Sequence, residues 1–268
     1  MESAGVSHVE LMKCVARRIV DPNVLRLIKL WLRSPVEERD EAGRRRMSGG
    51  KSNRKGTPQG GVVSPLLANL YMNRFLKFWR LKECGKTFRA RVVNYADDFV
   101  ILSRGKAAEA LAWTRDVMTK LGLTINETKT SLRDARAEDF DFLGYTFGQV
   151  YALHGEPYLG ARPSAKSLGR IKAKIGDLLK PGNMGTWPSV SKRLNRLLGG
   201  WSGYFGYGTL SAAYRAVDRH VCDRVQRFLN RRAKRDGRGV RMYSPTAICG
   251  EYGVARLTRR TSSAVSLA

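Results

Sequence analysis

The stretch from Val92 to Ile101 reads VVNYADDFVI. Branched and aromatic residues flank a short acidic turn, and this composition is typical of two β-strands joined by a tight connection. We therefore expect a β-hairpin over residues 89–102 with Asp97 and Asp98 at its tip. Adjacent aspartates can hold Mg²⁺, because phosphoryl-transfer sites often use two metal ions roughly 3.5–4 Å apart, bound by carboxylates. Taken alone, such a pair is more often an ordinary solvated turn, so the rest of the chain must decide.

Upstream of this hairpin, a glycine-rich turn leads directly into a predicted helix. The turn spans Gly56–Gly61 and reads GTPQGG. A serine N-cap at Ser64 and a proline at Pro65 then begin the helix, whose apolar residues recur at spacings of three and four. This pattern predicts a buried helix, and exposed amides in the turn before it could bind phosphate.

The N-terminal part of the chain predicts two short helices and a hairpin or loop. Apolar residues at helical spacing indicate a helix over residues 9–19, and Asp21 with Pro22 ends it and caps a second helix that runs to about Arg33. The following stretch, residues 37–55, is charged and glycine-rich without a period. We expect it to form a hairpin or a mobile loop.

Beyond the acidic hairpin, the pattern predicts one more helix and a strand. Residues 106–121 show helical spacing, and Gly122 supplies a C-terminal stop. Aromatic residues alternate over residues 140–150, which favours a strand that bends at Gly144. Residues 1–158 should therefore form one α+β domain.

The remaining residues, 159–268, predict a basic helical bundle. Helical patterns appear near residues 164–179, 189–201 and 211–234. The last helix has one apolar face, and its other faces carry more positive charge than solvation alone would need. We expect the bundle to bind nucleic acid through the arginines of that helix: Arg215, Arg219, Arg224, Arg227, Arg231 and Arg232.

The overall composition supports a polyanionic partner. Lysine and arginine total 49 against 23 acidic residues, a net charge of +26. A ribosomal or nucleoid protein would also fit this charge, so motifs are needed to indicate chemistry. Four separated cysteines without metal-ligand spacing predict free thiols in the cytoplasm, and no apolar run is long enough for a membrane span.

Four motifs in order resemble those of group II intron reverse transcriptases. The GTPQGG turn is followed downstream by Tyr95-Ala96-Asp97-Asp98, then by residues 122–130 (GLTINETKT) and by residues 141–145 (DFLGY), which are similar to the primer-grip motif of the family. The resemblance extends into the thumb, or maturase, region. There it rests on Asn195, Leu198, Gly200, Trp201, Tyr204 and Phe205.

This resemblance implies a fold and a domain organisation. The fold would be a partial right-hand polymerase palm, an antiparallel sheet with helices, followed by an α-helical thumb bundle. Residues 1–158 would be a partial fingers and palm domain. Residues 159–268 would be a maturase-like domain that binds RNA.

The resemblance also implies roles for individual residues. Asp97 would be a catalytic metal ligand with Asp98 as its companion, and Lys129 would lie beside the leaving phosphates, where it could neutralise or protonate developing charge. Lys129 is equally well explained as one more surface lysine, and the DFLGY stretch as an ordinary core strand. The nucleotide pocket would include Pro58, Gln59 and Gly60, and the primer grip would include Phe142, Leu143, Gly144 and Tyr145.

The aromatic residues of the thumb have two interpretations. Trp201 could stack on an unpaired base, an interaction worth about 1–3 kcal/mol. It also shares helical spacing with Leu194, Leu197 and Leu198, which favours a place in the core of the bundle. We therefore expect Trp201 to pack in the core and arginines to make most of the RNA contacts.

By resemblance, the protein would be an RNA-directed DNA polymerase that binds intron RNA and assists splicing. It would use two Mg²⁺ ions, an RNA template, a DNA primer and dNTPs. The family also uses an earlier aspartate motif, and no such string precedes Ser7. We therefore expect an N-terminally truncated chain with an incomplete metal site, which polymerises little unless a separate N-terminal fragment supplies that strand. The alternatives are a non-catalytic maturase-like RNA-binding fragment and an unspecific basic RNA binder.

Overall fold

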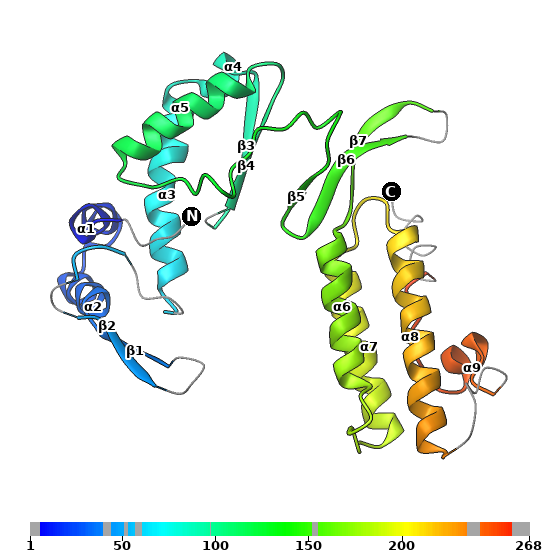
Figure 1. Ribbon diagram of the computed structural model, residues 1–268. Coiled ribbons are helices and arrows are strands. Elements are labelled where there is room, and N and C mark those ends of the chain that lie inside the picture. Colours follow the sequence, from blue (N-terminus) through cyan, green and yellow to red (C-terminus); the bar gives the residue numbers. More distant parts are fainter. Residues whose placement is uncertain are drawn as a thin grey trace. The chain divides into compact units, whose positions relative to one another are not determined.

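The chain folds into two compact units, residues 1–132 and 133–268, and each is described by itself. The computed structural model describes residues 6–39, 44–50, 53–56, 61–96, 98–151, 155–234 and 242–258. Helices and antiparallel sheets alternate along the chain (Figure 1), which confirms the expected mixture of α and β structure.

The first unit combines helices with two separate hairpins. Asp21 caps the second helix as predicted, because its Oδ1 accepts a hydrogen bond from the amide of Asn23 at 2.7 Å. Residues 37–55, for which we expected a hairpin or a mobile loop, include most of a hairpin of strands β1 and β2. The elements are α1 (His8–Ala16), α2 (Pro22–Leu32), β1 (Pro35–Arg39), β2 (Arg45–Gly49), α3 (Ser64–Leu81), α4 (Cys84–Thr87), β3 (Ala90–Tyr95), β4 (Asp98–Ser103) and α5 (Ala107–Lys120).

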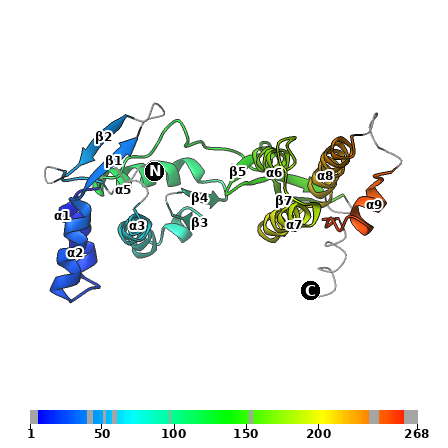
Figure 2. The same ribbon diagram turned by 90° about the horizontal axis from the view of Figure 1, so that it is seen from below.

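An aromatic cluster holds the first unit together. Phe75 and Trp79 of α3 lie 6.1 Å apart between ring centroids, and both lie near Trp113 of α5. Phe99 of β4 completes the cluster, 5.6 Å from Phe75. One face of the β3–β4 hairpin is thus covered by α3 and α5 (Figure 2), and burial of such aromatic rings dominates the stability of a core.

Helix α3 begins one residue earlier than the sequence suggested. Ser64 is its first residue, and Val63, whose side chain makes no capping hydrogen bond, takes the N-cap position. The expected serine N-cap is therefore wrong. The backbone explains the difference, because the Leu67 amide already bonds to the carbonyl of Val63 and so draws Ser64 into the first turn.

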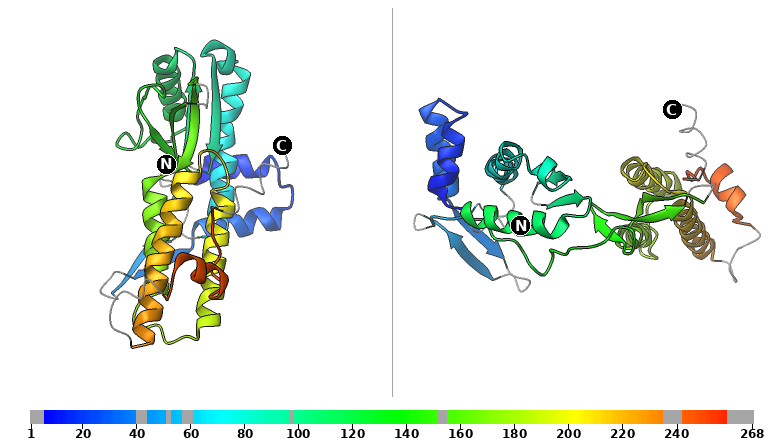
Figure 3. Two further views of the ribbon diagram at one scale, coloured as in Figure 1. Left: turned by 90° about the vertical axis from the view of Figure 1, so that its right-hand side faces the viewer. Right: turned by 90° about the horizontal axis from the view of Figure 1, so that it is seen from above.

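The second unit places a three-stranded antiparallel sheet at one end of a helical bundle (Figure 3). Its strand order is β5-β6-β7, and α6, α7, α8 and α9 share one hydrophobic core. The three helices expected from the sequence are confirmed, and α9 was not predicted. The elements are β5 (Phe140–Phe142), β6 (Tyr145–Tyr151), β7 (Pro157–Pro163), α6 (Ala165–Leu178), α7 (Trp187–Tyr204), α8 (Ser211–Arg232) and α9 (Pro245–Gly250).

The single bent strand expected over residues 140–150 is wrong. The structure has two strands in its place, with Phe142 paired to Tyr145 across a tight turn. Leu143 and Gly144 adopt φ values of 50° and 81°, and consecutive left-handed residues reverse the chain rather than bend it. The predicted domain boundary after residue 158 lies within β7 and stays a prediction.

No helix among the described residues is both long and apolar enough to cross a membrane.

Candidate catalytic hairpin and nucleic-acid contacts

The β3–β4 hairpin forms as the sequence predicts and places Asp98 beside its turn. Tyr95 pairs with Asp98, and Ala96 follows Tyr95 in the turn. Ala96 adopts a φ of 51°, and its carbonyl accepts a long hydrogen bond of 3.4 Å from Nδ2 of Asn94. Asp97 itself lies outside the described residues.

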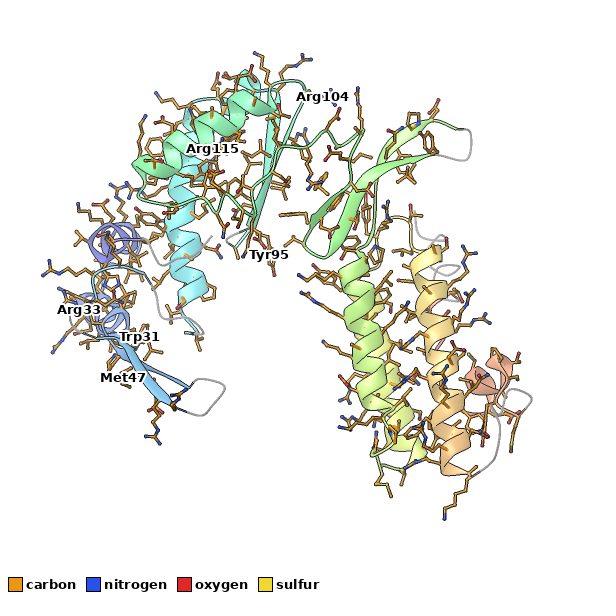
Figure 4. The ribbon with its side chains drawn as sticks, in the orientation of Figure 1. Trp31, Arg33, Met47, Tyr95, Arg104 and Arg115 are labelled. Atoms are coloured by element: carbon orange, nitrogen blue, oxygen red, sulfur yellow. The ribbon has the colours of Figure 1, made fainter. Side chains whose placement is uncertain are left out.

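Asp98 lies at the exposed start of β4. It shares a face of the hairpin with Tyr95, which is 64% exposed, whereas the opposite face packs against α3 and α5. Figure 4 shows Tyr95 at the turn end of the hairpin. Carboxylate oxygens are the ligands that Mg²⁺ prefers, and Asp98 offers them to solvent at the surface. Within the described ranges, no group of three or more His, Cys, Asp or Glu residues could hold a metal ion.

The segment that leads into the GTPQGG turn is held by the start of the chain. The carbonyl of Gly56 lies 2.7 Å from Nε2 of the buried His8, and because a carbonyl only accepts, Nε2 must carry the proton. The Gly56 amide bonds in turn to Val6, and the His8 amide bonds to Arg54. Sequence reasoning missed His8, and the three predicted pocket residues, Pro58, Gln59 and Gly60, lie outside the described part of the chain.

Lys129 lies exposed in the ordered segment after α5. Its amide donates to the carbonyl of Asn126 at 3.0 Å, and Oδ1 of Asn126 accepts from the amide and the hydroxyl of Thr128. Arg115 of α5 (Figure 4) donates to both carboxylate oxygens of Glu127, at 2.7 and 3.1 Å. This pair lowers the pKa of Glu127 and raises that of Arg115. Arg115 was not predicted, because a partner twelve residues away leaves no local pattern.

The predicted primer-grip residues form the turn between β5 and β6. The carbonyl of Gly144 accepts two hydrogen bonds of 2.9 Å, from the amide of Ser164 and from Oγ of Ser167. A Cβ on Gly144 would lie only 3.0 Å from Oγ of Ser167. The turn is therefore fitted closely against the first turn of α6, and the flanking residues Phe142 and Tyr145 are half-buried.

The arginines predicted to bind RNA differ in their surroundings. Arg224 is half-buried, and its Nη2 donates to the carbonyl of Gly176 in α6 at 3.0 Å. Arg232 is exposed, but it lies over the ring of Phe228 and bonds to the carbonyl of Asn183. The other four are exposed along α8: Arg215, Arg219, Arg227 and Arg231.

Trp201 packs against the core of the second unit, as expected. Its ring centroid lies 5.0 Å from that of Phe205 and 5.9 Å from that of Tyr214. The structure thus favours core packing over base stacking for this side chain.

The predicted residues divide between the two units. The acidic tip, the flank of the glycine-rich turn and Lys129 belong to the first unit, and the primer-grip turn and the arginines belong to the second. Within the first unit, hydrogen bonds hold the segment before the predicted pocket residues and the segment around Lys129.

Two family models match the chain. The model described as "Reverse transcriptase (RNA-dependent DNA polymerase)" matches residues 4–147, and the model described as "Group II intron, maturase-specific domain" matches residues 168–244. The first match spans more than half of the chain and includes both the acidic hairpin and the primer-grip turn.

A curated protein and a solved structure can also be compared with the chain. Protein YkfC of Escherichia coli (strain K12) is 28% identical over 208 residues, which cover 63% of this chain and 52% of that protein. A structure of telomerase from Candida albicans, in complex with a TWJ fragment of telomeric RNA, covers 92% of this chain and 40% of its own. It aligns with a TM-score of 0.38 at 12% identity. The chain therefore spans about half the length of the curated relative that it matches.

Proposed function

Because this chain belongs to the reverse transcriptase family and carries the maturase-specific domain of group II introns, we propose that it provides RNA-directed DNA synthesis for such an intron. In the same proposal, it binds the intron RNA and assists splicing. The observation that carries the proposal is the exposed carboxylate of Asp98 at the tip of a tight hairpin, inside the residues matched by the reverse transcriptase family.

The proposed fold is a partial right-hand polymerase palm followed by a helical thumb. Residues 1–158 would form the fingers and palm part, and residues 159–268 the maturase-like thumb. The antiparallel β3–β4 hairpin backed by α3 and α5 supports the palm, and the α6–α8 bundle supports the thumb.

Asp97 and Asp98 are the proposed ligands of Mg²⁺. Hard oxygen donors on an exposed turn suit this ion, and Asp98 meets that requirement. When bound, the metal would stabilise negative charge that develops on the phosphates. The chain's own contribution is the rigid backing of the hairpin, since Phe99 is fixed in the aromatic cluster directly after Asp98.

Lys129 is the proposed partner of the leaving phosphates. An ammonium group could neutralise charge there or donate a proton, provided that it comes within hydrogen-bond reach. The ordered turn of Asn126 and the Arg115–Glu127 pair support this role, because they restrict the backbone on which Lys129 stands. Pro58, Gln59 and Gly60 are the proposed lining of the nucleotide pocket.

The second unit would hold the nucleic acid. The turn Phe142–Tyr145 is the proposed primer grip, and the arginines of α8 would contact template and intron RNA through their phosphates. Arg215, Arg219, Arg227, Arg231 and Arg232 are exposed and suited to this role, whereas Arg224 would add charge while it bonds to α6.

A reducing compartment, the cytoplasm, is the proposed location. All four cysteines, Cys14, Cys84, Cys222 and Cys249, are free thiols. Such thiols persist in the cytosol, where disulfides are rare.

Primer extension on an RNA template with Mg²⁺ tests the proposal. The reaction should be run with this chain alone and with a polypeptide that carries the family's earlier aspartate motif added in trans. We expect synthesis in the mixture, and we expect Asp97→Ala to reduce it by about a hundredfold or more, because the metal site loses a ligand.

Asp116→Ala is the matched control. Asp116 is an exposed aspartate of the first unit, and its partner is Lys120 on the same helix. RNA binding should survive both substitutions. If the wild-type chain makes no DNA either alone or in the mixture, polymerase activity is contradicted and the maturase-like RNA binder is the function that remains. If Asp97→Ala makes as much DNA as wild type in the mixture, the assignment of Asp97 as a metal ligand is overturned.

A further inference from the structure

The turn between β5 and β6 has a backbone that needs outside support. Leu143 adopts a φ of 50°, in the left-handed region that side chains other than glycine seldom occupy. Strand β5 is only three residues long, so few ladder bonds fix the turn from that side. Strained turns of this kind persist only where surrounding groups hold them, and they gather at functional sites.

Helix α7 provides that support at its C-terminal end. The hydroxyl of Tyr204 donates to the carbonyl of Leu143 at 2.9 Å. In the opposite direction, the hydroxyl of Tyr145 donates to the carbonyl of Tyr204 at 2.8 Å. The two tyrosines thus exchange hydrogen bonds between the turn and α7, and we name this pair the tyrosine clamp.

The clamp acts together with α6 on two successive carbonyls. The Leu143 carbonyl bonds to Tyr204, and the Gly144 carbonyl bonds to Ser164 and Ser167. Two adjacent peptide groups anchored to two different helices cannot rotate independently. The orientation of the turn is therefore set by the helical bundle rather than by its own short strands.

The aromatic rings of the clamp also pack against each other and against Phe205. The centroid of the Tyr145 ring lies 5.0 Å from that of Phe205 and 6.2 Å from that of Tyr204. Burial raises the pKa of the Tyr145 phenol, so this hydroxyl keeps its proton and remains a donor throughout the neutral range.

We infer that Tyr204, within the residues matched by the maturase-specific domain, is a positioning residue that fixes the primer-grip turn through the carbonyl of Leu143. This inference rests on the proposed function, which assigns the primer grip to Phe142–Tyr145. Tyr204 touches neither substrate nor metal in this scheme. It acts on primer binding through the turn, so the maturase region contributes to polymerase geometry as well as to RNA binding.

Tyr204→Phe tests the inference, because it removes one hydroxyl and keeps the ring. We expect the KM for primer–template to rise about five- to tenfold, the loss that one hydrogen bond commonly causes, with kcat at saturating primer nearly unchanged. Tyr207→Phe is the matched control, since Tyr207 lies three residues further on and is exposed. The assay is primer extension, run with the chain alone or with the added polypeptide that carries the earlier aspartate motif, whichever reaction proceeds with the wild-type chain.

A second variant separates positioning from general destabilisation. Asn195 of α7 bonds to the carbonyl of Gly253 and to the amide of Ala255, away from the turn. Asn195→Ala should lower the thermal midpoint of the protein without changing the KM for primer–template.

A double variant tests whether the two tyrosines act together. In Tyr145→Phe/Tyr204→Phe, the loss of primer affinity should be smaller than the sum of the losses in the single variants, because both hydroxyls hold one turn.

The outcomes distinguish this inference from the proposed function. Wild-type extension with an unchanged primer KM in Tyr204→Phe would overturn the positioning role and leave the polymerase assignment in place. An equal KM increase in Asn195→Ala would also overturn it, because general destabilisation would then explain the effect. Absence of wild-type extension in both forms would contradict the proposed function and, with it, the inference.

Discussion

The turns of the β3–β4 and β5–β6 hairpins are held in different ways. Both turns begin with a residue other than glycine at positive φ, Ala96 at 51° and Leu143 at 50°. Among the described residues, the carbonyl of Ala96 accepts one long bond of 3.4 Å, from Asn94 of the strand before it. The carbonyls of Leu143 and Gly144 accept three bonds of 2.9 Å from α6 and α7 and the connection before α6.

This difference follows from what each turn carries. The carboxylate of Asp98 beside the first turn requires water or a cation, since burial of an unpaired charge is costly, and Asp98 accordingly remains exposed. The second turn, Leu143 and Gly144, carries no charge, so its half-buried backbone can pack against helices once its carbonyls are bonded. The first turn is thus suited to present a carboxylate to solvent or a cation, and the second is suited to hold its backbone in a fixed orientation.

The largest expected effect concerns the two carboxylates that flank these turns. Asp98→Asn should reduce primer extension by about a hundredfold, because a neutral amide cannot replace a metal-binding carboxylate. Asp141→Asn changes a comparable exposed aspartate in β5, whose partner is the hydroxyl of Thr146, and should leave the rate within about threefold. Steady-state primer extension measures both, and equal losses would contradict the division between the two hairpins.

A smaller effect is expected from two separate variants, one that adds a methyl group to the second turn and one that removes a methyl group from the first. Gly144→Ala places a Cβ at a φ of 81°, 3.0 Å from Oγ of Ser167 and 3.2 Å from the ring of Phe205. It should lower the free energy of unfolding by about 1–3 kcal/mol. Ala96→Gly removes a Cβ from a left-handed residue and should change stability by less than about 1 kcal/mol.

Urea unfolding followed by tryptophan fluorescence measures both variants. Trp79 and Trp113 report on the first unit, and Trp187 and Trp201 report on the second. A loss for Ala96→Gly as large as that for Gly144→Ala would show that the first turn is held as firmly as the second.

The smallest expected effect is a dependence on pH at Glu10, a carboxylate of the first unit. The pKa of Glu10 in α1 is lowered below its ordinary value of 4.5 by two hydrogen bonds. The larger effect comes from Lys13 of the same helix, and the next comes from Arg74 of α3. A carboxyl group whose pKa is lowered by folding stabilises the protein at pH values above its ordinary pKa. This contribution disappears as the pH falls through the lowered pKa. Neutral hydroxyls and carbonyls hold the second turn, so acid should not loosen it.

Stability measured at pH 7 and near pH 3 tests this contrast. Glu10→Gln should be slightly less stable than wild type at pH 7, and the difference should shrink in acid. Glu156→Gln, an exposed position in the second unit, serves as the control and should match wild type at both pH values. A difference for Glu10→Gln that grows in acid would refute the sign of the effect.

Local patterns predicted most of the elements, because their signals lie within a few residues. The Asp21 cap, the helix after residue 63, the acidic hairpin and the three long helices of the second unit all have short-range signatures. The error over residues 140–150 arose because alternating aromatics look the same in one bent strand and in two paired strands. Only positive φ at Leu143 and Gly144 distinguishes them, and leucine does not signal it.

The sequence by itself determined the family, the basic character and the order of the motifs, since each depends on residue types that are close together along the chain. Only the tertiary structure decided which groups support those motifs. His8 reaches Gly56 across 48 residues, and Tyr204 reaches Leu143 across 61. Such pairs leave no periodic or local signal, because a hydrogen bond depends on where two atoms meet in space, and folding alone brings them within 3 Å.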